Sequence, residues 1–173
     1  MTLGMELGIN GKVAVVTGGG RGLGFAIAKR LAEQGAQLVI VDILSTEEIA
    51  VSLDELAAFG REPLHLCKDI SIEEECAAII QTAIDTFGSV DIVVNNAGIQ
   101  KGSWEKVIGV NLLSQYNLNT AAAQDMKKRN YGKIVNITTS GTFSGGGGDV
   151  KYNATKGAAD SMTRYLAKSF GRY

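Results

Sequence analysis

The sequence contains very little proline, histidine or cysteine: one Pro, one His and two Cys among 173 residues. The two cysteines, Cys67 and Cys76, cannot build a disulfide framework, so we expect both to be reduced, buried thiols. The single histidine, His65, gives no basis for a zinc site, and we predict no metal in this protein. We expect His65 to be a packing residue.

Neither sign of charge is in surplus, because 17 Lys and Arg face 18 Asp and Glu for a net charge of -1. No basic excess is present to hold a nucleic-acid backbone. The apolar runs, such as 13–16 and 38–41, are far shorter than the roughly 20 residues of a membrane span. Residues 1–7 also lack the basic and then apolar pattern of a signal peptide. We therefore expect a cytoplasmic protein without nucleic-acid or membrane partners.

Glycine, in contrast, is abundant: 22 of 173 residues, or about 13%, against an average of about 7%. With a single proline this excess is not typical of a disordered linker, so the positions of the glycines carry the information. The length and the 45% hydrophobic content suit one compact domain. We place this domain at 11–173, after an N-terminal extension at 1–10.

Short apolar runs alternate with amphipathic stretches along the chain. The runs are typical of strands covered on both faces of a parallel sheet, and they lie at 13–16, 38–41, 64–67, 92–94 and 134–137. The amphipathic stretches predict helices at about 23–35, 49–60, 71–88, 104–129 and 152–170. Ser71 and Glu74 form a possible capping box for the third helix, and 140–148 is predicted as a loop with flexible glycines at its end. The alternation implies an α/β fold, a doubly wound parallel sheet with helices on both faces.

A glycine cluster, Thr17-Gly-Gly-Gly-Arg-Gly-Leu-Gly24, separates the first predicted strand from the first helix. A sharp turn and a close backbone approach require residues without side chains. The free amides and the positive dipole end of the following helix would face a pyrophosphate. A phosphoryl-transfer P-loop would need Gly-Lys-Ser/Thr here, which argues against a kinase or GTPase. We assign cofactor binding to Gly18, Gly20, Arg21, Gly22, Leu23 and Gly24.

Asp42 ends the second predicted strand, 18 residues after Gly24. Its carboxylate is placed to accept hydrogen bonds from the adenosine ribose hydroxyls and to repel a 2′-phosphate, which favours NAD over NADP. Arg21 acts in the opposite direction, because a cation beside the loop can pair with a 2′-phosphate. Since the carboxylate would lie directly against that phosphate, we predict NAD.

Further motifs follow in order: Asn95-Asn96-Ala97-Gly98, Asn111, and Tyr152-Asn-Ala-Thr-Lys156. With the glycine cluster, they make the chain resemble the short-chain dehydrogenase/reductase family from about Gly11 onward. The glycine spacing is similar to that of its simple one-domain branch, and less to that of the longer branch of sugar-nucleotide epimerases and dehydratases. The resemblance implies a Rossmann-like domain and these cofactor contacts: Asp42, Ile43, Asp69, Ile70, Asn96, Ala97, Gly98, Tyr152 and Lys156.

Tyr152 and Lys156 are four residues apart on a predicted helix and share one face, so the ammonium can stabilise a phenolate. The resemblance implies that Tyr152 is the acid or base of hydride transfer between a secondary alcohol and NAD. It also implies that Lys156 holds the nicotinamide ribose and that Asn111 supports a water-mediated proton relay. A polar residue satisfying a helix irregularity is the alternative role of Asn111. The family's catalytic serine position is Thr139 here, whose methyl group crowds the pocket, so we expect reduced or altered activity.

The resemblance implies segments beyond those present in this sequence. Family members continue after Tyr173 through a further strand, a lid and a last strand, and they have a longer stretch between Gly98 and Asn111. We therefore expect a sheet without its final strands, and a sequence that is the ordered part of a longer chain. The alternative is a nucleotide-binding subunit without turnover. Pairing of the long helices near 112–126 and 152–170 in the family predicts a homodimer or homotetramer acting on a small-molecule alcohol or ketone.

Overall fold

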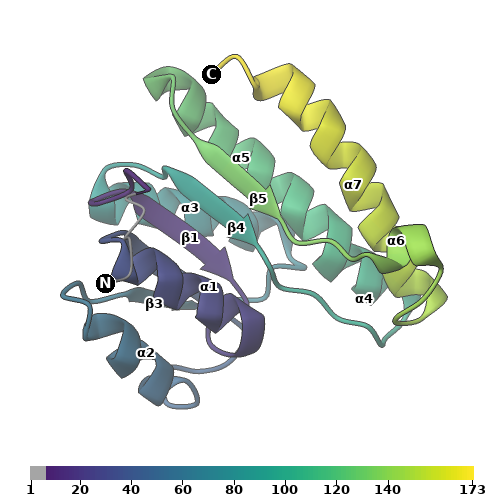
Figure 1. Cartoon of the computed structure of the whole chain (residues 1–173), viewed down its shortest axis with the longest axis horizontal. Helices are drawn as coiled ribbons and strands as arrows, with labels where there is room; N and C mark the ends of the chain where they lie inside the picture. Colours follow the sequence, from purple (N-terminus) through teal and green to yellow (C-terminus); the bar gives the residue numbers. More distant parts are fainter. Residues whose placement is uncertain (1–6) are drawn as a thin grey trace, which may run out of the picture.

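The computed structural model describes residues 7–173, and Figure 1 shows the arrangement of their helices and strands. Positions 1–6 of the predicted N-terminal extension lie outside the described residues. The elements are β1 (Val13–Thr17), α1 (Gly22–Glu33), β2 (Gln37–Asp42), α2 (Ala50–Ala57), β3 (Leu64–Cys67), α3 (Glu73–Phe87), β4 (Ile92–Asn95), α4 (Trp104–Ile108), a π-helical segment (Gly109–Leu113), α5 (Ser114–Arg129), β5 (Lys133–Asn136), α6 (Gly141–Ser144) and α7 (Val150–Phe170).

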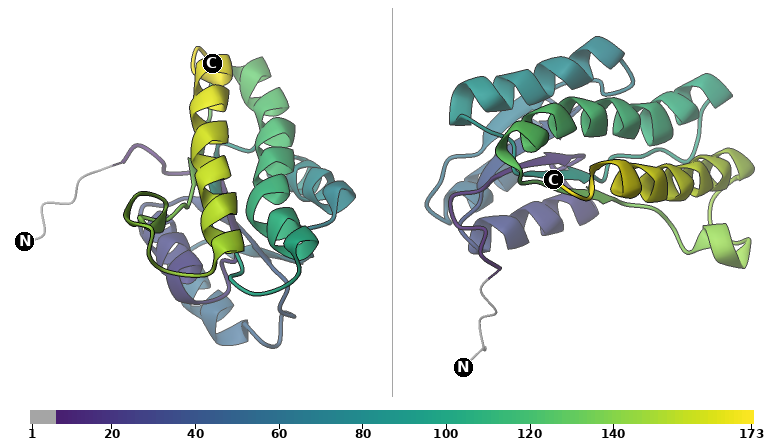
Figure 2. Two further views of the ribbon diagram at one scale, coloured as in Figure 1. Left: turned by 90° about the vertical axis from the view of Figure 1, so that its right-hand side faces the viewer. Right: turned by 90° about the horizontal axis from the view of Figure 1, so that it is seen from above.

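The five strands form one sheet in the order β3-β2-β1-β4-β5, and every pair is parallel. The order places β1 in the centre, where the run at 13–16 is completely enclosed. Side chains on both faces of such a covered strand are buried, which explains its continuous apolar sequence. Figure 2 shows helices on both sides of the sheet. The predicted doubly wound α/β fold is confirmed.

Two apolar layers cover the sheet. One face packs against α3 and α5, through residues such as Ile79, Leu118 and Met126. The other face packs against α1 and α2, through Ala28 and Leu56 among others. Each crossover helix thus buries one apolar stripe on the sheet, as the periodicity of the sequence predicts.

The two cysteines differ in their surroundings. Cys76 of α3 is completely buried, and this burial raises the pKa of its thiol to about 12. Cys67 is exposed at the end of the outermost strand β3, and its Sγ donates a hydrogen bond to the Ile43 carbonyl oxygen at 3.5 Å. The expectation of two buried thiols is therefore correct for Cys76 and wrong for Cys67, because an edge strand lacks a covering neighbour.

Three local predictions need correction. Ser71 does not cap α3, because its hydroxyl donates to Asp69 Oδ1 at 2.7 Å and the helix begins only at Glu73. The helix predicted at 104–129 is interrupted by the π-helical segment between α4 and α5. The loop predicted at 140–148 contains the short helix α6.

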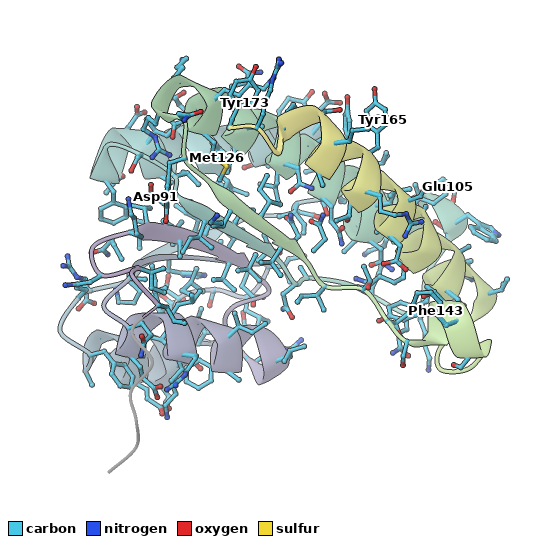
Figure 3. All side chains as sticks on the ribbon, turned by 45° about the horizontal axis from the view of Figure 1, so that its top comes forward. Asp91, Glu105, Met126, Phe143, Tyr165 and Tyr173 are labelled. Atoms are coloured by element: carbon cyan, nitrogen blue, oxygen red, sulfur yellow. The ribbon has the colours of Figure 1, made fainter. Side chains whose placement is uncertain are left out.

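A buried carboxylate, Asp91, joins the amino ends of β1 and β4 to the last turn of α5 (Figure 3). It accepts hydrogen bonds from Val13 N at 3.0 Å and from Arg129 Nη1 at 2.7 Å. Arg129 also donates to the Val90 carbonyl oxygen at 2.6 Å. Burial opposes the charge, but the Val13 amide and the Arg129 guanidinium together hold the pKa of the Asp91 carboxyl below its usual value.

This cluster generates a stability prediction. Asp91→Asn should lower the free energy of unfolding at pH 7 by roughly 1.5–3 kcal/mol, the range for a hydrogen bond to a charged group. A carboxyl whose pKa is lowered by folding stabilises the protein above the pKa of the unfolded chain, about 3.9. The difference between wild type and variant should therefore shrink as the pH falls toward 3, as measured by urea unfolding.

The exposed pair Arg30–Glu33, 2.6 Å apart, offers a matched control. Glu33→Gln should change the unfolding free energy by less than about 1 kcal/mol, because solvent screens a surface ion pair. An Asp91→Asn effect no larger than that of Glu33→Gln would contradict the structural role of Asp91.

Candidate functional site

A cavity of about 460 Å³ lies at the edge of the sheet where the parallel strands end. In open parallel sheets this edge is the usual place for a ligand. Nine residues predicted to bind the cofactor line it: Gly18, Arg21, Asp42, Ile43, Asp69, Ile70, Asn96, Ala97 and Gly98. The other lining residues are Val41, Lys68, Ile99, Lys106 and Val110.

The glycine cluster folds as a tight turn from β1 into α1. Gly18 has a φ of +62°, and its amide donates to the Val41 carbonyl oxygen at 2.7 Å. A methyl group on Gly24 would collide with the Gly18 carbonyl, so the helix can lie on the turn only without a side chain there. The first residue of α1 is Gly22, and Arg21, which precedes it, makes no side-chain cap. The first amides of the helix are therefore available to an anion.

Asp42 lies beside this turn with its carboxylate held by backbone amides. Its Oδ2 accepts from Gly20 N at 3.0 Å, and its Oδ1 accepts from Leu44 N at 3.3 Å. A methyl group on Gly20 would approach Asp42 Oδ2 to 2.9 Å and Ile49 Cγ2 to 2.7 Å. The absence of a side chain at Gly20 thus allows the turn to contact the carboxylate.

The next part of the rim comes from the end of β3. Asp69 accepts two hydrogen bonds from Ser71, one from the hydroxyl at 2.7 Å and one from the amide at 2.9 Å. These bonds hold the pKa of the Asp69 carboxyl below its usual value. Lys68 forms an ion pair with Glu75 at 2.6 Å. The rim therefore carries fixed charges of both signs.

Thr17 joins the ends of β1 and β4. Its hydroxyl oxygen accepts hydrogen bonds from the amides of Asn96 and Ala97, each at 3.1 Å. The Asn96 side-chain Nδ2 donates hydrogen bonds to the carbonyl oxygens of Thr17 at 3.0 Å and Gly18 at 3.2 Å. Thr17 is not among the predicted site residues; its place as the first residue of the glycine cluster is the signal that points to it.

Asn111 is fully buried in the π-helical segment. Its Oδ1 accepts from Ile99 N at 2.8 Å, and its Nδ2 donates to the Ile99 carbonyl oxygen at 2.8 Å. The Nδ2 also donates to Thr155 Oγ1 of α7 at 3.2 Å. Asn111 therefore connects the segment after β4 to α7.

Tyr152 and Lys156 lie in the first turns of α7. The Asp149 carboxylate caps this helix, accepting from Lys151 N at 2.9 Å and from Tyr152 N at 3.1 Å. Lys156 is only 2% exposed; its Nζ donates to the Ile137 carbonyl oxygen at 2.6 Å and lies 5.8 Å from the centre of the Tyr152 ring.

Gly98 lies between Lys156 and the cavity. A methyl group on Gly98 would lie 3.3 Å from Asn111 Oδ1 and 3.5 Å from Lys156 Nζ. The segment from Asn96 to Gly98 thus lines the cavity on one side and approaches the Lys156 ammonium on the other.

Thr139 follows β5 and begins the turn into α6. Its hydroxyl oxygen accepts from Gly141 N at 3.2 Å, while its carbonyl oxygen accepts from Thr142 Oγ1 at 2.9 Å. A hydroxyl has two acceptor positions and one donor hydrogen, so the Gly141 bond leaves the hydrogen of Thr139 for another partner.

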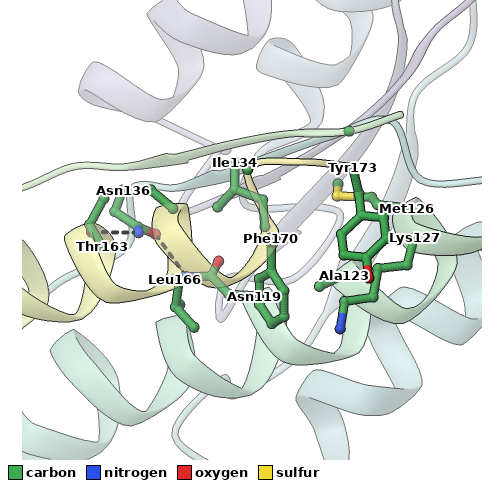
Figure 4. Close-up of a pocket in the computed structure, with 13 residues that line it drawn as sticks. Asn119, Ala123, Met126, Lys127, Ile134, Asn136, Thr163, Leu166, Phe170 and Tyr173 are labelled. Atoms are coloured by element: carbon green, nitrogen blue, oxygen red, sulfur yellow. Dashed lines mark hydrogen bonds between the residues drawn. The ribbon is translucent and has the colours of Figure 1, made fainter. Parts of the chain in front are cut away.

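Buried amides join the strand ends to the helices behind the site. Asn95 Nδ2 donates to Asn119 Oδ1 at 2.6 Å and to Asn136 Oδ1 at 2.8 Å, and Asn136 Nδ2 donates to Thr163 Oγ1 at 2.9 Å. A second cavity, of about 180 Å³, opens between α5, β5 and α7 (Figure 4). Its lining includes Asn119, Asn136 and Thr163 but no predicted site residue.

No three His, Cys, Asp or Glu side chains in 7–173 come close enough together to hold a metal ion. No helix in the same range is both long enough and apolar enough to cross a bilayer.

The comparisons with known proteins agree with this geometry. The family described as short chain dehydrogenase matches residues 12–173. The chain is 36% identical to a (hydroxy(phenyl)methyl)succinyl-CoA dehydrogenase subunit of Thauera aromatica, covering 96% of this chain and 70% of the relative. It is also 36% identical to the 2-dehydro-3-deoxy-D-gluconate 5-dehydrogenase of Dickeya dadantii, covering 95% of this chain and 68% of that enzyme.

A solved structure, NAD+-bound xylitol dehydrogenase, superimposes with a TM-score of 0.88 at 28% identity. The match covers 94% of this chain and 66% of that one, so the chain spans about two thirds of the length of the proteins it matches. Because the family match extends from the strand before the glycine cluster to the end of α7, the chain belongs to the short chain dehydrogenase family of oxidoreductases.

Proposed function

We propose that this chain carries the cofactor site and the catalytic residues of an NAD-dependent oxidoreductase that interconverts a secondary alcohol and a ketone. The observation that carries the proposal is the position of Gly98, which lines the cavity at the strand ends and approaches the buried Lys156 ammonium. A cofactor in the cavity would therefore end beside Lys156 and Tyr152 of α7.

The residues around the cavity fit an NAD molecule. The uncapped α1 and its glycine turn, with Gly22 and Leu23 at the helix start, would hold the pyrophosphate. Asp42, whose carboxylate is fixed by Gly20 N, would accept hydrogen bonds from the adenosine ribose hydroxyls and would repel a 2′-phosphate. The adenine would contact Asp69 and Ile70, and Ile43 lines the same cavity. The nicotinamide ribose would contact Asn96, Ala97 and Gly98 of the lining, and Tyr152 and Lys156 beside Gly98. The NAD+ in xylitol dehydrogenase supports this choice over NADP.

When bound, NAD accepts or supplies the hydride, which no side chain can do. Tyr152 takes the proton of the alcohol as a general base and returns it in the reverse direction. The Lys156 ammonium, held by the Ile137 carbonyl, stabilises the phenolate that Tyr152 becomes. Thr139 donates its free hydroxyl hydrogen to the substrate oxygen. Asn111 holds the Ile99 backbone and α7 together, so that the proton relay near Lys156 keeps its geometry.

The proposal extends to substrate and assembly. Two relatives are named for an acyl-CoA thioester and a sugar acid, which supports a small-molecule alcohol or ketone as the substrate here. Tyr116 on α5 and Val150 on α7 are 50% and 71% exposed, and we infer a homodimer or homotetramer that covers them. We also propose the cytoplasm as its location.

The role of Tyr152 is tested by Tyr152→Phe, which removes only the hydroxyl. With secondary alcohols and NAD, kcat should fall at least 10²-fold, the usual contribution of a general acid or base. The Kd for NADH should change far less than kcat, because one hydroxyl is only one of many proposed contacts to the dinucleotide. Turnover is followed by NADH absorbance and binding by NADH fluorescence.

Tyr165→Phe is the matched control, since it removes the same group from an exposed position of the same helix. It should leave kcat unchanged. A kcat of Tyr152→Phe equal to that of the wild type would refute the catalytic role of Tyr152. NADH binding without any turnover in the wild type would favour a nucleotide-binding subunit.

Burial makes the charge on Lys156 costly. It lowers the pKa of the Lys156 ammonium, and the Asp160 carboxylate opposes this only in part. A lysine whose pKa is lower in the folded state destabilises the protein while it is charged there. This cost disappears as the pH rises through the folded pKa toward the unfolded value of about 10.4.

Lys156→Met removes this titration while keeping a side chain of similar length. The wild type should gain unfolding free energy relative to the variant as the pH rises from 7 to 10, because its unfolded state binds the extra proton. The control Lys168→Met, at an exposed position of α7, should show no such trend. Parallel curves for wild type and Lys156→Met in urea unfolding would show that Lys156 has no lowered pKa.

A further inference from the structure

The loop between α6 and α7 ends against the ring of Tyr152. Gly148, four residues before the tyrosine, has a φ of +84°, in the left-handed region that favours glycine. A side-chain carbon on Gly148 would lie 2.8 Å from Cδ1 and 3.3 Å from Cγ of Tyr152. The tyrosine ring therefore occupies the space that a side chain at Gly148 would need.

The loop is fixed at this point. Asn153 Nδ2 donates to the Gly147 carbonyl oxygen at 2.8 Å and to the Asp149 carbonyl oxygen at 3.2 Å. The Asp149 carboxylate caps α7, and Lys151 Nζ donates to the Gly102 carbonyl oxygen at 2.9 Å. Because these bonds hold the backbone on both sides of Gly148, we expect a side chain added there to displace the ring rather than the loop.

The partner of the tyrosine is equally fixed. Lys156 Nζ is bound to the Ile137 carbonyl oxygen at 2.6 Å, and the side chain is buried. Its Nζ lies 5.8 Å from the centre of the Tyr152 ring. A displaced ring would change the distance between the phenol and this bound ammonium.

We propose that Gly148 is a positioning residue for Tyr152: its lack of a side chain lets the ring lie against the loop, which sets the hydroxyl relative to Lys156 and the cavity. The inference rests on the proposed function in so far as Tyr152 is the acid or base. The contact between Gly148 and the ring can be tested whether or not the protein turns over.

Gly147 provides a matched control in the same loop. It has a φ of +78°, and a side-chain carbon there would meet nothing within 4 Å. Gly147→Ala and Gly148→Ala therefore introduce the same left-handed strain, and only Gly148→Ala adds a collision with Tyr152. Any difference between the two variants reports on the ring.

The first readout is kinetic. Gly148→Ala should lower kcat at least tenfold relative to Gly147→Ala and shift the pH profile of kcat, because the phenol no longer faces Lys156 in the same geometry. The Kd for NADH should be the same within twofold in the two variants. Equal kcat values and pH profiles for the two variants, with an active wild type, would overturn the positioning role.

The second readout is thermal unfolding and needs no turnover. The Tm of Gly148→Ala should be several degrees below that of Gly147→Ala, and this excess should vanish when Tyr152→Ala is added to both variants. If Gly148→Ala alone fails to fold, Tyr152→Ala should restore its folding. Equal Tm values for the two glycine variants would overturn the contact, and so would a Tm difference that persists when Tyr152→Ala is present. An inactive wild type that shows the expected Tm differences would refute only the proposed function.

Discussion

Parallel pairing of all five strands is the constraint on which the rest of the site depends. Because the strands run in one direction, their carboxyl ends meet at one edge, and the segments that follow β1, β2, β3 and β4 line the same cavity. The Thr17 hydroxyl then joins β1 to the segment after β4, and Asn95 joins β4 to β5 and α5. Segments far apart in the sequence are thereby held around one cavity.

Three buried charged side chains, Asp91, Asp42 and Lys156, differ in how completely their surroundings compensate the charge. Asp91, away from the cavity, has a guanidinium partner in Arg129, and Asp42 has two backbone amides. Lys156 has a backbone carbonyl as its hydrogen-bond acceptor, and Asp160 compensates its charge only in part. The incompletely compensated charge lies in the proposed catalytic group, as expected where activity is kept at the expense of stability.

Much of the fold and the lining of the cavity could be predicted from the sequence, because strand periodicity and glycine spacing are local signals. The features that were missed depend on contacts across the fold. The π-helical segment accompanies the bonds between Asn111 and Ile99, and the failed cap at Ser71 reflects competition from Asp69. Cys67 is exposed because β3 lies at the edge of the sheet. The order of the strands in the sheet cannot be predicted from local sequence patterns.

The most direct test of the account is a calorimetric titration of the 173-residue chain with NADH and with NADPH under identical conditions. We expect saturable NADH binding, at least tenfold tighter than NADPH binding, because the amides of Gly20 and Leu44 fix the Asp42 carboxylate beside the glycine turn. Tighter binding of NADPH would contradict the role of Asp42. Binding of neither nucleotide would contradict the assignment of the cavity.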